Sequence, residues 1–170
     1  MLKLISFIIV VMSVAGCSNE YTSQYKKIKK ILNSKLVIEN QEIHDRISES
    51  FNNNKLNFIT YLQSEECISC NLIKIKQMYQ HPIFEKYNIG CILILSPETS
   101  VEQIKMTKEL CSNQIKFIID YDSDFVNDNY TIFQNPAYKT FMIDADNRIK
   151  WVGNPLESHK TLTLFINSIK

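Results

Sequence analysis

The sequence has no excess of charge of either sign, no internal repeat and no low-complexity tract. Lysine and arginine total 19 and aspartate and glutamate total 18, so the formal net charge is +1. Proteins that bind nucleic acid do so largely through a positively charged surface. We therefore expect no nucleic acid among the partners of this chain.

Histidine is scarce, which argues against a metal site. The three histidines are His44, His81 and His159, and none stands at the spacing of a ligand pair. A structural zinc site needs four ligands. Cys67 and Cys70 could supply two of them, but no histidine pair is available to supply the other two. We predict no bound metal.

An almost unbroken apolar run lies near the N-terminus. Residues 4–14 are almost all apolar and follow a single lysine, Lys3. The run is too short for a permanent helix across a hydrocarbon core of about 30 Å. A charged start, a short apolar segment and small residues after it are typical of a secretory signal.

The end of this segment, Val14-Ala15-Gly16-Cys17, resembles the bacterial lipoprotein box. The resemblance implies cleavage before Cys17, diacylation of its sulfur and anchoring in membrane lipid, because two acyl chains hold a protein stably. It places the protein in the bacterial cell envelope, facing the periplasm or the exterior. A plain signal peptide followed by a chance cysteine is the alternative.

The rest of the chain predicts one α/β domain. The hydrophobic content of 45% is enough for a core. Periodicity and apolar runs predict strands at 36–38, 55–62, 91–95, 115–119, 140–144 and 148–152, and helices at 21–32, 67–80, 99–111 and 155–169. Residues 42–51 are ambiguous. This order predicts a three-layer sandwich in which helices flank a mixed sheet, parallel in its first half and closed by an antiparallel hairpin.

A pair of cysteines stands where the strand at 55–62 gives way to a helix. Cys67 and Cys70 are separated by two residues. A thiol at a helix N-terminus is stabilised as a thiolate by the macrodipole and by unpaired N–H groups. We expect Cys67 to be the exposed, attacking thiolate and Cys70, one turn further and buried, to be the resolving thiol in thiol–disulfide exchange.

The element order and the cysteine pair resemble the thioredoxin fold. The segment from Thr140 to Asp144 reads TFMID, and with Gly153 after it resembles the closing segment of the TlpA/ResA branch of thiol–disulfide oxidoreductases. The chain is also similar to exported thioredoxin-like lipoproteins of Bacteroides-type bacteria. The resemblance implies exported client proteins, a membrane dithiol donor of the DsbD type and no dissociable cofactor. It divides the chain into a signal peptide (1–16), a lipidated tether with a helix (17–35) and a thioredoxin-like domain (36–170).

The chain departs from the family's pattern at three places. Glu66, after Glu65, replaces the tryptophan before the first cysteine, and two carboxylates should raise the Cys67 pKa. Tyr138 stands at the cis-proline position, and the nearest proline is Pro136. Tyr61 replaces a buried acid. We expect Glu66 and either Pro136 or Tyr138 to border the partner groove.

Several alternatives stay open. We favour a reductase, and the alternative is a non-catalytic binding lipoprotein with a structural Cys67–Cys70 disulfide. Cys91 and Cys111 are expected to be buried free thiols, although a disulfide between them fits an oxidising compartment. Acidic residues stand at every second position from 120 to 124, as at the start of a calcium-binding loop. The glycine and the closing glutamate of such a loop are absent from the residues that follow. We expect a solvated loop there, near the dithiol.

Overall fold

The computed structural model describes residues 26–64, 67–111, 115–135 and 138–169. The chain divides into two units, Met1–Leu32 and Asn33–Lys170. In the first unit, residues 26–31 are helical. Cys17, Glu65, Glu66 and Pro136 lie outside the described residues. Within the described ranges, no helix is both long enough and apolar enough to cross a bilayer.

The second unit is built on one five-stranded mixed sheet, as predicted. Its strand order is β3-β2-β1-β4-β5. The first three strands are parallel to one another, while β4 runs antiparallel to β1, and β5 to β4. The strands are β1 (Leu56–Leu62), β2 (Ile89–Leu95), β3 (Ile115–Ile119), β4 (Thr140–Ile143) and β5 (Ile149–Val152).

One face of the sheet is covered by the helices that connect the parallel strands. Right-handed crossovers in one direction place consecutive connecting helices on the same face. These helices are α3 (Ile68–Tyr79), α4 (Pro82–Lys86) and α5 (Val101–Leu110), and the closing helix α8 (His159–Ser168) joins them. Phe58 lies at the centre of this layer, with its ring centroid 5.6 Å from that of Phe84 and 6.1 Å from that of Phe165.

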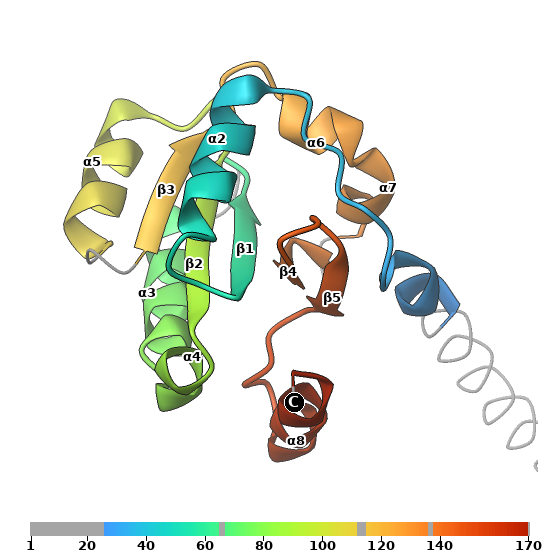
Figure 1. The fold of residues 1–170 in the computed structure, drawn as a ribbon. Helices are drawn as coiled ribbons and strands as arrows, with labels where there is room; N and C mark the ends of the chain where they lie inside the picture. Colours follow the sequence, from blue (N-terminus) through green and yellow to red (C-terminus); the bar gives the residue numbers. More distant parts are fainter. Residues whose placement is uncertain (1–25, 65–66, 112–114, 136–137, 170) are drawn as a thin grey trace, which may run out of the picture. The chain divides into compact units, whose positions relative to one another are not determined.

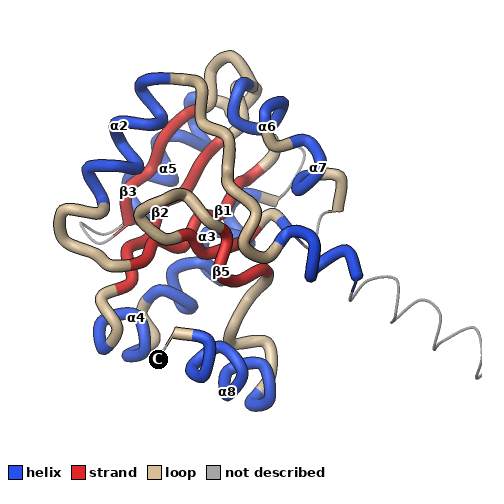
Figure 2. Tube along the Cα trace, turned by 45° about the vertical axis from the view of Figure 1, so that its right-hand side comes forward, coloured by secondary structure: helices blue, strands red, loops and turns tan. Residues whose placement is uncertain are grey.

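The other face is covered by α2 (Gln41–Ser50), α6 (Asp124–Asp128) and α7 (Tyr130–Phe133). Because side chains alternate along a strand, Tyr61 of β1 points to the face opposite Phe58. Its ring stacks on Phe125 at 6.3 Å and contacts Phe133 at 5.1 Å. Figures 1 and 2 show α2 and α3 on opposite sides of the sheet, which completes the predicted three layers.

The predicted strand at 36–38 is wrong. Only Lys35 forms a bridge, with Arg148. The side chain of Asn129 takes the place of a neighbouring strand, because its Oδ1 accepts from Val37 N at 2.9 Å and its Nδ2 donates to Val37 O at 2.6 Å. The Asn129 side chain therefore satisfies both backbone groups of Val37, while Leu36 N donates to Asn147 O at 2.8 Å.

The structure also defines the ambiguous segment and the start of the closing helix. The ambiguous segment 42–51 is helical, because Asn40 caps α2 by accepting from Ile43 N and the helix buries Ile43 and Ile47. The closing helix begins at His159 rather than at residue 155, because Ser158 is its N-cap.

The predicted hairpin turn between β4 and β5 is confirmed, and the Asp144 carboxylate accepts from two backbone N–H groups within it.

The core packing yields a stability prediction. Phe58 is completely buried and contacts two rings, so Phe58→Ala should lower the free energy of unfolding by about 3–5 kcal/mol. The control Leu164→Ala removes an exposed side chain of α8 and should change it by less than about 0.5 kcal/mol. Urea unfolding monitored by circular dichroism measures both. Equal effects would contradict the described core.

Candidate active site

The cysteine pair lies where β1 gives way to α3. Cys67 is the N-cap residue of α3, with φ −63° and ψ 88°, and its carbonyl oxygen accepts from Asn71 N at 3.0 Å. Its side chain makes no capping hydrogen bond. The sulfur of Cys67 is thereby positioned at the positive end of a 12-residue helix, where a thiolate is stabilised.

Cys67 and Cys70 form a disulfide, with their Cα atoms 5.4 Å apart, a separation typical of such a bond. Both residues are exposed. The predicted burial of Cys70 is therefore wrong. The buried face of α3 begins at Leu72, and two residues along an α-helix turn by about 200°, so Cys70 lies nearly opposite that face.

A hydroxyl group that the sequence reasoning missed lies beside the first sulfur. Ser69 Oγ is 3.5 Å from Cys67 Sγ. A serine hydroxyl can donate to a thiolate, so Ser69 can stabilise the anion that forms when the disulfide is reduced. A serine two residues after the first cysteine, in the first turn of the helix, is the sequence signal for this contact.

The segment before the disulfide is held by two neighbouring strands. Ser64 N donates to Ser96 Oγ at 3.0 Å, and Ser96 N donates to Leu62 O at 2.9 Å. Lys139, just before β4, donates from Nζ to Gln63 Oε1 at 2.6 Å. The carboxyl ends of β1 and β2 and the start of β4 therefore meet at the edge of the sheet that carries the disulfide.

Of the three residues predicted to border the partner groove, the structure describes only Tyr138. Glu66 and Pro136 lie outside the described residues. Tyr138 is 5% exposed, and its buried hydroxyl has no hydrogen-bond partner within the described residues. That Glu66 and either Pro136 or Tyr138 border a partner groove stays a prediction. A pocket of about 210 Å³ does lie beside α3, lined by Thr60, Asn71, Lys74 and Lys139 among others.

Tyr61 occupies the position at which thioredoxins have a buried acid, and its phenol ring is buried. Tyr61 is 2% exposed, and burial, reinforced by the charges of Asp120 and Glu98, raises its pKa well above the ordinary value. Tyr61 therefore stays neutral and faces α6 and α7. It does not provide the carboxylate that the resemblance to thioredoxins implies at this position.

A buried acid instead lies at the end of β3. Asp120 is completely buried, and Oδ1 accepts from Phe125 N at 3.3 Å. Burial raises its pKa, although backbone hydrogen bonds oppose this. The expectation of a solvated loop is wrong for Asp120 and confirmed for Tyr121 and Asp122, which are exposed. No group of three potential metal ligands occurs among the described residues.

Cys91 and Cys111 are free thiols, as favoured from the sequence. Cys91 is buried as expected, whereas Cys111 is only half-buried. Burial raises the pKa of both thiols, so both are poor nucleophiles near neutral pH. The reactive sulfur chemistry of the described residues is therefore concentrated at Cys67 and Cys70.

Comparisons with known proteins show that the fold is similar to that of solved structures. No family model and no curated protein matches the sequence. A Chlorobium tepidum protein described as a thiol:disulfide interchange protein DsbE is 8% identical, with a TM-score of 0.51 over 73% of this chain and 85% of that chain. This likeness shows a thioredoxin-like fold, as predicted.

Two further solved structures are similar at lower scores. One is described as a thioredoxin from Neisseria meningitidis, 16% identical, with a TM-score of 0.47 over 68% of this chain and 75% of that chain. The other is a Bacteroides fragilis protein of unknown function, 11% identical, with a TM-score of 0.48 over 69% of this chain and 84% of that chain.

The contact between Ser69 and Cys67 predicts a kinetic effect. Ser69→Ala removes the hydroxyl that stabilises the thiolate, so alkylation of Cys67 in the reduced protein should slow by about three- to tenfold at pH 7. Ser69→Thr keeps a hydroxyl and should retain most of the rate. Timed iodoacetamide labelling with mass mapping measures this, and equal rates in all three proteins would remove Ser69 from the site.

Proposed function

We propose that this protein is an exported, membrane-anchored thiol–disulfide oxidoreductase that reduces disulfides in other exported proteins. The observation that carries the proposal is the exposed Cys67–Cys70 disulfide at the N-terminus of α3. A disulfide that only braced the fold would gain nothing from exposure or from a helix N-terminus. The description of the Chlorobium protein as a thiol:disulfide interchange protein agrees with this chemistry.

In the reduced protein, Cys67 is the nucleophile. Its thiolate attacks one sulfur of a client disulfide, a bond forms between the two sulfurs, and the other client sulfur leaves as a thiolate. The Cys70 thiolate then attacks Cys67 Sγ and releases the second client thiol. The client gains two electrons and two protons, and the oxidoreductase ends with the Cys67–Cys70 disulfide seen in the structure.

The reaction needs no dissociable cofactor, because the electrons are carried by the two thiols. A second thiol–disulfide exchange, with a dithiol donor in the membrane, returns the protein to its reduced form. The exposure of both Cys67 and Cys70 supports this step, since the donor must reach one of the two sulfurs of the disulfide.

The location belongs to the same proposal. Cleavage after residue 16 and diacylation of Cys17 would anchor the chain in a membrane of the bacterial cell envelope. Residues 17–35 would then tether the thioredoxin-like domain to lipid. The low reactivity expected of buried Cys91 fits an oxidising compartment, where an accessible extra thiol would invite unwanted disulfides.

The direction of electron flow rests on charge. Strong oxidants of this chemistry owe their high potential to an unusually stable reduced form. Glu65 and Glu66 directly precede Cys67 in the sequence, and their carboxylates disfavour a neighbouring thiolate. Ser69 offsets part of this effect but carries no charge. The disulfide should therefore be comparatively hard to reduce, as suits a reductase.

Trapping of partners tests the exchange reaction. Cys70→Ser removes the resolving thiol, so mixed disulfides between Cys67 and client proteins should accumulate. Expression in the native host followed by non-reducing electrophoresis would reveal discrete adducts. The double variant Cys67→Ser, Cys70→Ser sets the background, and adducts no stronger than that background would favour a binding protein with a structural disulfide.

The reduction potential tests the direction. We expect a value nearer the roughly −270 mV of thioredoxin than the roughly −120 mV of DsbA. Replacing Glu65 and Glu66 with glutamine should raise the potential by about 30 mV, for a change worth about 1.4 kcal/mol. Equilibration with glutathione buffers measures both proteins. A wild-type potential above roughly −150 mV on this scale would reject the reductase and favour a disulfide donor or isomerase.

A further inference from the structure

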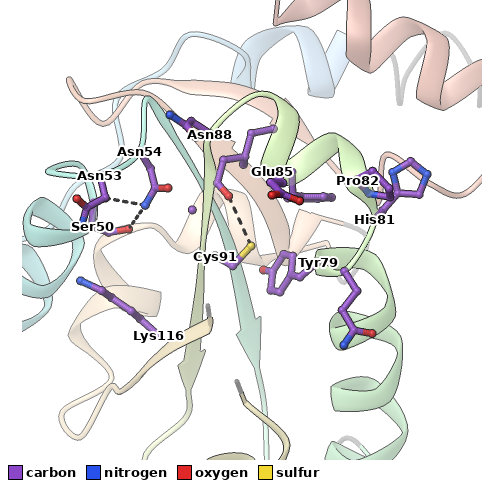
Figure 3. Close-up of a pocket in the computed structure, with 14 residues that line it drawn as sticks. Ser50, Asn53, Asn54, Tyr79, His81, Pro82, Glu85, Asn88, Cys91 and Lys116 are labelled. Carbon is purple, nitrogen blue, oxygen red and sulfur yellow. Dashed lines mark hydrogen bonds between the residues drawn. The ribbon is translucent and has the colours of Figure 1, made fainter. Parts of the chain in front are cut away.

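A second pocket lies at the edge of the sheet opposite the disulfide. Figure 3 shows it between the turn that follows α2 and the short helix α4, with Cys91 of β2 at its base. Gly90 of β2 also lines it. Its volume is about 410 Å³, within the range of about 300–1,000 Å³ typical of small-molecule sites. The amino ends of β1 and β2 lie here, whereas the disulfide follows the carboxyl end of β1.

The apolar pattern of the core is interrupted beside this pocket. Ser50 and Asn57 are buried polar residues, and Ser50 Oγ donates to Asn57 Oδ1. Asn54 Nδ2 donates to Ser50 O at 2.8 Å. Gly90 permits this arrangement, because a Cβ there would collide with the side chains of Asn57 and Asn54.

This polar network carries a cost in stability. Asn57 Nδ2 is buried and has no hydrogen-bond partner in the described part of the chain, and an unsatisfied buried donor is unfavourable. A glycine inside a strand weakens it and often marks a close approach. Buried polar residues, an unsatisfied donor and a strand glycine all lie beside this pocket. Such unfavourable features are expected to cluster at functional sites.

The network leaves one acceptor turned toward the pocket. Asn54 uses its Nδ2 within the network, and its Oδ1 points toward the centre of the pocket (Figure 3). The side chains of Asn53, Glu85 and Asn88 also line the pocket. Within the described part of the chain, these three side chains make no hydrogen bond or ion pair. The pocket therefore offers carboxamide donors and acceptors together with one carboxylate.

This set of groups matches hydroxyl groups better than an anion. A hydroxyl both donates and accepts, so it can donate to Asn54 Oδ1 or Glu85 and accept from a carboxamide N–H. The lysine of the pocket, Lys116, already pairs with Glu49 at 3.2 Å, and the Glu85 carboxylate disfavours an anionic ligand. The exposed ring of Pro82 supplies an apolar wall for the C–H face of a sugar ring.

We propose that this pocket binds a neutral monosaccharide or the end of a short neutral glycan. Its binding groups lie on the turn after α2 and on or beside α4, away from Cys67 and Cys70. The one sulfur at its base belongs to buried Cys91, which takes no part in exchange. The affinity for sugar is therefore the same in the oxidised and the reduced protein, and it does not depend on the proposed oxidoreductase function.

Calorimetric titration of the full chain tests this proposal, in a detergent without a sugar head group. The probes are glucose, galactose, mannose, N-acetylglucosamine and N-acetylgalactosamine, and we expect saturable binding of at least one. Asn53→Ala and Glu85→Ala should each weaken that binding by about tenfold, as the loss of one hydrogen bond predicts. The control Asn52→Ala alters an exposed residue of the same turn outside the pocket and should leave it unchanged.

Three results would overturn the proposal. The first is the absence of binding by all five sugars. The second is unchanged affinity in both Asn53→Ala and Glu85→Ala, which would place the sugar elsewhere. The third is tighter binding of glucuronate or of a blocked Gly-Gly dipeptide than of any neutral sugar, which would assign the pocket to an anion or a peptide. None of these results bears on the Cys70→Ser trapping experiment.

Discussion

The parallel pairing of β1 with β2 is the interaction on which the rest of the structure depends. It runs from Leu56 and Ile89 to Leu62 and Leu95 without a break, and nearly every side chain along it is buried. A strand covered on both faces is held in one register, because a slip of one residue would exchange its two faces. The carboxyl end of β1 is thereby fixed, and α3 with its cysteine pair begins just beyond it.

The position of the disulfide follows from this scaffold and from the helix that carries it. Leu72, Ile75 and Met78 turn α3 onto the sheet, and that same rotation turns Cys70 outward. Both sulfurs are therefore open to partners, although the stabilising helix N-terminus favours Cys67 as the attacking group. Tyr61 and Asp120 depart from what the resemblance to thioredoxins implies. The buried carboxylate is at the end of β3 rather than on β1.

The two edges of the sheet carry different chemistry for a physical reason. At the carboxyl edge, the first turn of α3 exposes unpaired N–H groups that favour an anion such as a thiolate. At the amino edge, Asn54 Nδ2 donates to Ser50 O, and buried Ser50 donates in turn to Asn57. The pocket beside them is lined by carboxamides together with the Glu85 carboxylate. With the reactive sulfurs at one edge and the neutral amides at the other, a ligand in the pocket need not interfere with exchange at the disulfide.

The elements whose pattern is local could be predicted from the sequence alone. The continuous apolar run of β2, the cysteine pair after β1 and the turn after Asp144 were all predictable, because periodicity, spacing and turn chemistry depend on near neighbours. Tertiary structure alone decided the rest. The pairing of Val37 with the Asn129 side chain joins residues far apart in the chain. The exposure of Cys70 and the burial of Asp120 likewise depend on which side of each helix or loop packs against the sheet. Only the tertiary packing of the helices determines this.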